Sequence, residues 1–172
     1  VGTVVHLALE QLSLLEHLPV SCQGADLDRW KMALRRLGLC GESLQQAVDA
    51  VAHNVDTALA DPQGRWILSS QHVSAHSEYA VSCTGSAGRV MDLVIDRTFV
   101  DRASGDCWIV DYKTSRPQPD DALQGFLARE AEHYREQLLS YRDALAQLGA
   151  ATIRCALYFS AIGEFYELSL EA

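Results

Sequence analysis

The stretch LVIDRTFVDRASGDCWIVDYKTS, from Leu93 to Ser115, predicts a β-hairpin. Two apolar runs flank a polar segment rich in Asp, Ser and Gly, which is the composition of a hairpin turn. The apolar runs also carry three charged residues, Asp96, Asp111 and Lys113. Charged side chains are rarely buried unless they are paired, so the directions in which these three point become the central question.

The length of the turn decides which residues of the hairpin face each other. A four-residue turn at Arg102–Gly105 would place Asp96 opposite Asp111, whereas a two-residue turn at Ser104–Gly105 would place it opposite Lys113. Both registers keep the same parity, so the three charged side chains share one face in either case. The other face collects side chains that we expect to form core: Leu93, Ile95, Phe99, Trp108, Val110 and Tyr112.

Two interpretations of the charged face remain open at this point. Adjacent carboxylates repel each other unless a cation neutralises them, and a divalent metal ion with oxygen ligands would do so. A salt bridge between Lys113 and the two acids, solvated at a sheet edge, would neutralise them as well. The hairpin alone does not decide between a metal site and a salt bridge.

The rest of the chain predicts an α/β fold with a central mixed sheet flanked by helices and an N-terminal helical segment. Apolar spacing of the helical kind covers residues 3–17, 28–39 (capped by Asp26 or Asp28), 43–59 and 123–148, the last ended by Gly149. A two-residue period, typical of strands, covers residues 65–69, 77–83, 89–100, 107–114, 152–160 and 164–170.

The length of 172 residues predicts a single domain. We divide it into a helical part over residues 1–60 and a part with the sheet and the long helix over 65–172. Because the sequence begins with Val rather than Met, we expect it to be excised from a longer protein. It contains no apolar run long enough to cross a bilayer and no signal-peptide layout, so we expect a cytoplasmic protein without a membrane partner.

The cysteines and the net charge argue against some classes of site and of partner. The five cysteines are scattered, without a C-x-x-C pair, which argues against a zinc or iron–sulfur site and for reduced thiols. The net charge of −9 argues against broad electrostatic attachment to nucleic acid. Any action on DNA or RNA would therefore need local compensation or a basic partner domain.

The pattern VIDRTFVD…WIVDYKTS closely resembles the nuclease motif of the RecB-like branch of the PD-(D/E)xK superfamily. In that branch the first Asp follows an apolar strand and the second opens a D-Y-K-T run. GTVVH, at Gly2–His6, resembles the branch's N-terminal helix with a metal-binding His. AEHYREQLLSY contains Gln137 and Tyr141, which match its Q-x-x-x-Y motif. The overall likeness is to the C-terminal nuclease domain of UvrD-type helicase–nucleases such as AddA and RecB.

The resemblance implies a restriction-endonuclease-like core and a metal-dependent DNA exonuclease that acts in double-strand break repair and recombination. It implies Mg²⁺ or Mn²⁺ as the cofactor, with no iron–sulfur cluster. The residues it assigns are Asp96, Asp111 and Lys113 for catalysis, His6, Asp96, Asp111 and the carbonyl of Tyr112 for the metal, and Gln137 and Tyr141 for contacts to the site or the DNA.

The partners implied are DNA strands, a helicase motor in the same parent chain, and a second helicase–nuclease subunit. The chain has no G-x-x-x-x-G-K-[ST] loop, so we expect it to bind no nucleotide itself. An alternative is a nuclease fold that has lost its chemistry and serves as a structural or DNA-guiding module. Glu78 is left without a defined role, and Asp92 is interpreted as a flanking acid.

Overall fold

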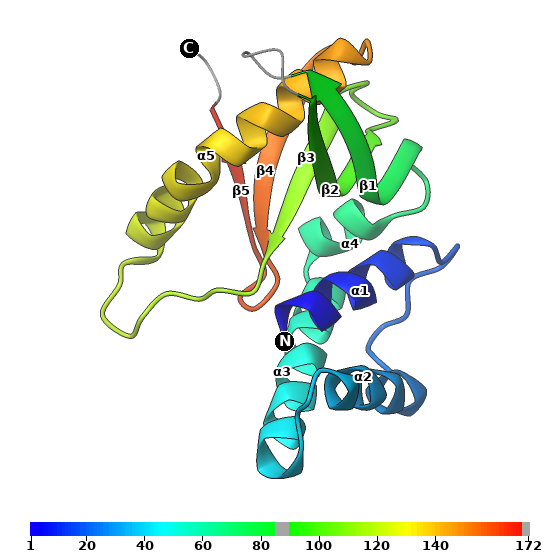
Figure 1. Cartoon of the computed structure of the whole chain (residues 1–172), viewed down its shortest axis with the longest axis vertical. Helices are drawn as coiled ribbons and strands as arrows, with labels where there is room; N and C mark the ends of the chain where they lie inside the picture. Colours follow the sequence, from blue (N-terminus) through cyan, green and yellow to red (C-terminus); the bar gives the residue numbers. More distant parts are fainter. Residues whose placement is uncertain (85–89, 170–172) are drawn as a thin grey trace. The chain divides into compact units, whose positions relative to one another are not determined.

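The computed structural model describes residues 1–84 and 90–169 and consists of two compact units (Figure 1). We call them the helical unit and the sheet unit. The helical unit comprises Val1–Ser70, Lys113–Ser115 and Phe159–Glu164, and the sheet unit comprises Gln71–Tyr112, Arg116–Tyr158 and Phe165–Ala172. Each unit is described below by itself.

The sheet has five strands in the order β1-β2-β3-β4-β5. Their bounds are Val73–Thr84, Val90–Val100, Cys107–Lys113, Ile153–Phe159 and Glu164–Leu168. β1 and β2 pair antiparallel, as do β2 and β3. β3 and β4 run parallel, because Cys107 N–H donates to Thr152 O at one end and Ser160 N–H donates to Lys113 O at the other. The chain between them forms the long crossover that a parallel pair requires.

The register of the β2–β3 hairpin confirms the four-residue turn. Arg97 pairs with Val110 and Phe99 with Trp108, which is the register that places Asp96 opposite Asp111. Asp101 N–H donates to Asp106 O at 2.9 Å and closes the turn. The alternative two-residue turn is therefore wrong.

The predicted core face of this hairpin is buried. Ile95, Phe99, Trp108, Val110 and Tyr112 are each at most 6% exposed. Leu93 is only partly buried.

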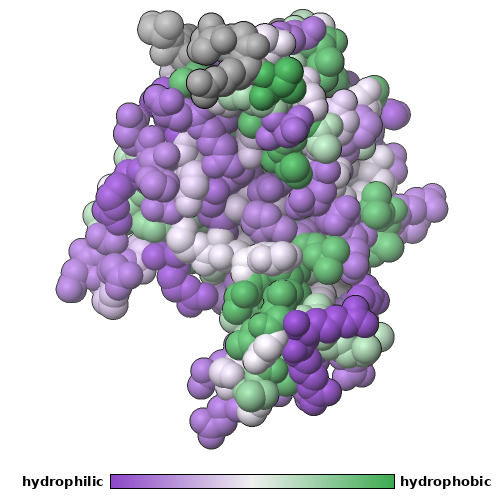
Figure 2. Space-filling model, in the orientation of Figure 1, coloured by the Kyte–Doolittle hydropathy of each residue, from purple (hydrophilic) through white to green (hydrophobic). Residues whose placement is uncertain are grey.

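The crossover between β3 and β4 contains helix α5, Leu123–Gln147, which crosses one face of the sheet (Figure 1). Its outer surface is mainly hydrophilic (Figure 2). Gly149, at φ 90°, lies just past its end, where a left-handed residue commonly terminates a helix. The helix buries one apolar stripe, formed by Phe126, Leu127, Ala131, Leu138, Tyr141, Ala144 and Leu145.

The helical unit contains α1 (Gly2–Ser13), α2 (Gly24–Arg36), α3 (Gly41–Ala60) and α4 (Pro62–Leu68). α3 packs against each of the other three. The apolar stripe expected for the third helix is buried along α3: Leu44, Ala47, Val48, Val51, Val55 and Leu59. Apolar side chains also reach the surface of this unit (Figure 2), including Leu14, Met32 and Leu37.

The strand predicted over residues 65–69 is wrong, because these residues belong to helix α4 and the loop after it. Asp61 caps the helix through hydrogen bonds from the N–H groups of Gln63 and Gly64, and Pro62 occupies the first turn. Both features favour a helix start. A short apolar run does not by itself distinguish a strand from a buried helical turn.

Other boundaries differ more modestly from the prediction. α1 ends at Ser13, four residues earlier than expected, and α2 begins at Gly24, where Gln23 and Asp26 form a capping box. Arg89 and Leu170, at the ends of two predicted strands, lie outside the described residues. The predicted class, an α/β fold with a central mixed sheet and helices, is confirmed. Among the described residues, no helix has both the length and the apolar character of a membrane span.

Candidate active site

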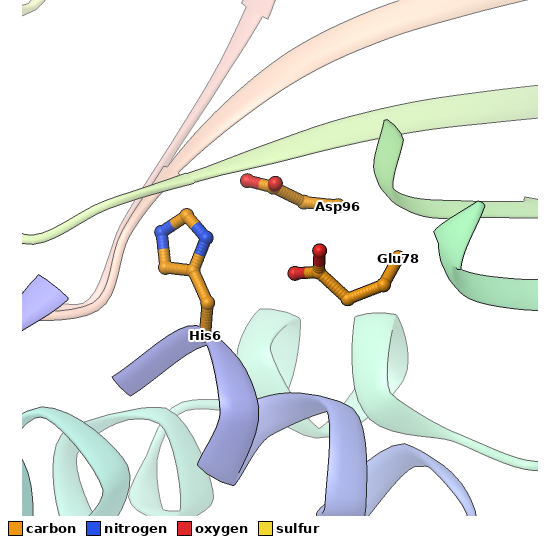
Figure 3. A group of neighbouring side chains, drawn as sticks. All are labelled: His6, Glu78 and Asp96. Atoms are coloured by element: carbon orange, nitrogen blue, oxygen red, sulfur yellow. The ribbon is translucent and has the colours of Figure 1, made fainter. Parts of the chain in front are cut away.

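Three carboxylates lie in a row across β1, β2 and β3 of the sheet unit. The register of β1 and β2 is unbroken on both sides of Glu78, which places Glu78 opposite Asp96. The register of β2 and β3, continued by one residue, places Asp96 opposite Asp111. A carboxylate oxygen of Glu78 lies within 4.8 Å of one of Asp96, and the two side chains extend in the same direction (Figure 3).

Asp96 is held by the backbone of the neighbouring strand. Its Oδ2 accepts the N–H of Tyr112 at 2.7 Å. The regular ladder of paired residues between β2 and β3 ends at Arg97 and Val110. Beyond it, the Asp96 carboxylate accepts a backbone N–H of β3 in place of a backbone carbonyl. A hydrogen bond to a charged acceptor is stronger than one between neutral groups, and it fixes the orientation of this carboxylate.

Asp111 is 2% exposed and is held by helix α5. Gln137 Nε2 donates to Asp111 Oδ1 at 3.0 Å and to the Tyr141 hydroxyl oxygen at 2.7 Å. Burial raises the pKa of Tyr141, although the hydrogen bond from Gln137 opposes this, so the phenol stays neutral near pH 7. With both amide protons engaged, Gln137 presents a donor to the carboxylate in a fixed orientation.

The backbone at Glu78 is strained. Its φ is 47°, in the left-handed region that a long side chain seldom adopts. Such a conformation costs on the order of 1–3 kcal/mol and is concentrated at functional sites. Ser74 and Thr152 also have positive φ, but Glu78 is the one that faces Asp96, which makes it a candidate member of the site. Sequence reasoning left its role open.

A buried cation lies on the opposite face of the sheet from the carboxylates. Arg97, next to Asp96 in β2, is 2% exposed; it donates to Ser77 Oγ at 3.2 Å and its guanidinium carbon lies 5.6 Å from the Phe99 ring centroid. Burial lowers the pKa of Arg97 and raises the pKa of Tyr112. The face predicted to be apolar core therefore contains a guanidinium, which the sequence pattern did not reveal.

The remaining predicted residues belong to the helical unit. Lys113 is the last residue of β3, and its side chain is partly buried. His6 projects from α1 and is partly buried. α1 begins close to the end of β3, since a Cβ at Gly2 would lie 3.7 Å from Thr114 Oγ1. The structure thus brings together Glu78, Asp96, Asp111, Gln137 and Tyr141, while the roles of His6 and Lys113 stay predictions.

Comparison with known proteins identifies the family of the chain. The family model described as PD-(D/E)XK nuclease superfamily matches residues 1–166. The chain belongs to the PD-(D/E)XK nuclease superfamily. No curated protein matches the chain. Among solved structures it is similar to one titled "Crystal structure of SSO0001", with 16% identity, 98% of this chain and 76% of the other covered, and a TM-score of 0.40.

PD-(D/E)XK nucleases typically use divalent metal ions such as Mg²⁺, and the donor set of this chain fits such an ion. Mg²⁺ and Mn²⁺ prefer oxygen ligands, and Mg²⁺ is commonly held by one or two carboxylates together with water and substrate phosphate. Glu78, Asp96 and Asp111 supply carboxylate oxygens from three adjacent strands. Glu78 and Asp96, whose carboxylate oxygens lie within 4.8 Å of each other, are therefore a candidate metal site, and Asp111 is the next acid along the row on β3.

Proposed function

We propose that this protein is a Mg²⁺- or Mn²⁺-dependent DNA nuclease domain. The observation that carries the proposal is the carboxylate row of Glu78, Asp96 and Asp111 in a chain of this superfamily. Three acids on adjacent strands are unfavourable without a neutralising cation. The site is thus arranged to hold a cation, and its donor atoms suit the ions that hydrolyse phosphodiesters.

The metal ion would be held by Asp96, Asp111 and the carbonyl of Tyr112, with Glu78 as a further oxygen donor. When bound, the ion polarises the scissile phosphate and lowers the pKa of a bound water. Asp96 is oriented for this by the Tyr112 N–H, and Asp111 by Gln137. Both carboxylates would therefore enter the site with one oxygen already fixed.

Lys113 would act on the phosphate rather than on the metal. It shares a strand face with Asp111, because side chains two residues apart point the same way. Its ammonium would stabilise the charge that develops on the phosphate oxygens or would hold the attacking water. Such a positive group contributes most in the transition state, so its loss should lower kcat more than it raises KM.

His6 would complete the ligand set from helix α1. The G-x-x-x-H spacing of Gly2 and His6 at the start of α1, which resembles the metal-binding helix of the RecB-like branch, supports this role. An imidazole nitrogen suits Mn²⁺ better than Mg²⁺. His6→Ala should therefore weaken Mn²⁺ binding with little change in stability, and a calorimetric titration with equal affinities for both proteins would exclude His6 as a ligand.

At a finer level, we propose a RecB- or AddA-like exonuclease domain of a cytoplasmic helicase–nuclease in double-strand break repair and recombination. The D-Y-K-T run and Gln137 with Tyr141 support this branch. A helicase motor that delivers single strands would also compensate for the net charge of −9. A second helicase–nuclease subunit is a further expected partner.

The test is a cleavage assay on end-labelled single- and double-stranded DNA with Mg²⁺, Mn²⁺, or EDTA. We expect cleavage that depends on the metal and leaves 5′-phosphate ends. Mn²⁺ binding without cleavage would point to a DNA-guiding module, and the absence of both would overturn the proposal.

A further inference from the structure

A buried polar contact joins α3 to the end of the D-Y-K-T strand within the helical unit. Asn54 and Ser160 are 2% and 0% exposed, and Ser160 Oγ lies 2.7 Å from Asn54 Oδ1. The same hydroxyl lies 3.2 Å from the carbonyl oxygen of Lys113, which also accepts the Ser160 N–H at 2.9 Å. Ser160 thus approaches the Lys113 carbonyl with both its backbone and its side chain.

Asn54 is polar within an otherwise apolar stripe of α3. Its neighbours on the stripe, Val51 and Val55, are at most 1% exposed. A buried amide costs free energy unless its hydrogen bonds are made. Asn54 makes them in two directions: Nδ2 donates to Ala50 O at 2.8 Å, and Oδ1 accepts from Ser160. The first contact fixes which side of the amide faces Ser160.

The Ser160 hydroxyl has two possible acceptors, Asn54 Oδ1 and the Lys113 carbonyl oxygen. A hydroxyl has one proton, so it donates either to Asn54 or to the Lys113 carbonyl at a given moment. In both arrangements Ser160 Oγ stays between the two oxygens, and the backbone N–H holds the carbonyl throughout. The peptide that follows Lys113 is therefore fixed against α3.

We infer that Asn54 and Ser160 are positioning residues for Lys113. Fixing the carbonyl of the last residue of β3 fixes the direction in which its side chain leaves the strand. Residues behind an active site commonly orient a functional side chain in this way. The inference rests on the proposed role of Lys113 in cleavage. It adds that α3 restrains the backbone from which the Lys113 side chain leaves the strand.

His53 provides a matched control on the same helix. His53 Nε2 lies 2.9 Å from the carbonyl oxygen of Ala161, the residue after Ser160. It therefore anchors the same turn to α3 but does not contact Lys113. If the contacts only stabilise the fold, the loss of His53 and the loss of Ser160 should have similar consequences.

The contact between Ser160 and the Lys113 carbonyl can be followed directly by NMR, because the chain has two lysines, Lys31 and Lys113, and labelling can select one of them. Labelling with carbonyl-¹³C lysine and ¹⁵N threonine selects one peptide bond, Lys113–Thr114, because Lys31 is followed by Met32. We expect the carbonyl resonance of Lys113 to move in Ser160→Ala and in Asn54→Ala, and to stay in place in His53→Ala. An unmoved resonance in both Ser160→Ala and Asn54→Ala would overturn the inference.

The functional readout is a double-mutant cycle with Lys113→Ala, in which DNA and Mn²⁺ are each titrated so that kcat, KM and Mn²⁺ affinity are obtained for every protein. Ser160→Ala should lower kcat about tenfold in the wild-type background, with KM and Mn²⁺ affinity unchanged, and less than about twofold in the Lys113→Ala background. Each protein is assayed well below its unfolding temperature, and His53→Ala should retain wild-type kcat.

The outcomes separate this inference from the proposed function. An equal loss of kcat in both backgrounds would mean that Ser160 acts on the fold and not through Lys113, and the inference would fail alone. An unchanged kcat in Ser160→Ala would have the same meaning. A wild-type protein that does not cleave DNA would overturn the proposed function, and the positioning role with it.

Discussion

Strand β2 carries an Asp at two positions, 92 and 96, in different surroundings. Asp92, near the start of the strand, lies opposite Ser82, whose hydroxyl donates to Asp92 Oδ1 at 2.6 Å. Asp96, four residues later and on the same strand face, lies opposite the carboxylate of Glu78. It also accepts the N–H of Tyr112 on the other side.

The difference shows that the neighbours of an acid, and not the acid itself, indicate a site. Asp92 is exposed and satisfied by a neutral hydroxyl, so it needs no ion. Asp96 stands between two further carboxylates, Glu78 and Asp111, and hydrogen bonds alone do not remove the repulsion among three negative charges. Asp92 is therefore the natural control for each prediction about the row.

The largest effect is expected at Asp111. Asp111→Ala should lower metal-dependent cleavage by more than about 100-fold, since removing even a group behind a metal ligand typically costs 10–100-fold. Asp92→Ala should retain wild-type cleavage. The measurement is kcat on labelled DNA, with circular dichroism to show that both variants fold. Cleavage by Asp111→Ala at the wild-type rate would remove Asp111 from the site.

A smaller effect is expected at Glu78, which sequence reasoning left unassigned. Glu78→Gln keeps the shape of the side chain and removes its charge, so Mn²⁺ affinity should fall about tenfold. Asp92→Asn removes the same charge from the same pair of strands and should change affinity less than about twofold. Equal losses in the two variants would show that only net charge matters, and that Glu78 is not a ligand.

Two side chains of α5, Gln137 and Tyr141, should also differ in how much their loss lowers kcat. Gln137→Leu removes the donor to Asp111 and should lower kcat about tenfold. Tyr141→Phe leaves that donor in place and should lower kcat only a few-fold, because it removes a single hydrogen bond of about 1 kcal/mol. A larger loss in Tyr141→Phe than in Gln137→Leu would assign the main role to the hydroxyl instead.

The smallest effect concerns stability without metal. In EDTA, Glu78→Gln relieves repulsion with Asp96 and should raise the free energy of unfolding by up to about 1 kcal/mol. Asp92→Asn weakens a charge-assisted hydrogen bond and should lower it by about 0.5 kcal/mol. Urea unfolding at neutral pH measures both values. Changes of the same sign in the two variants would contradict the contrast between the surroundings of Asp92 and those of Asp96.

Local patterns made the hairpin and most helices predictable. The alternation and the turn residues between Leu93 and Ser115 predicted the two strands and the face that the three charged residues share. They also limited the register to two possibilities, because all of this information lies within one short segment. The missed helix α4 also had a local signal, Asp61 followed by Pro62, which is a common helix start. The apolar period of residues 65–69 was the weaker indication there.

Other parts of the site depend on contacts that a single segment does not encode. Glu78 enters the row through the register of β1 against β2, which no local pattern specified. Asn54 and Ser160 are separated by 106 positions, and neither belongs to a recognisable motif. Arg97 received no role from the sequence, and it is buried beside Phe99. Long-range packing decides all of these.

The most direct test of the central claim is a Mn²⁺ titration of Asp96→Asn and Asp92→Asn by calorimetry. The two variants remove one charge each from the same face of the same strand, and both substitutions preserve the size of the side chain. We predict that Asp92→Asn binds Mn²⁺ like the wild type and that Asp96→Asn shows no specific binding. Equal affinities in the two variants would contradict the assignment of the metal site to the carboxylate row.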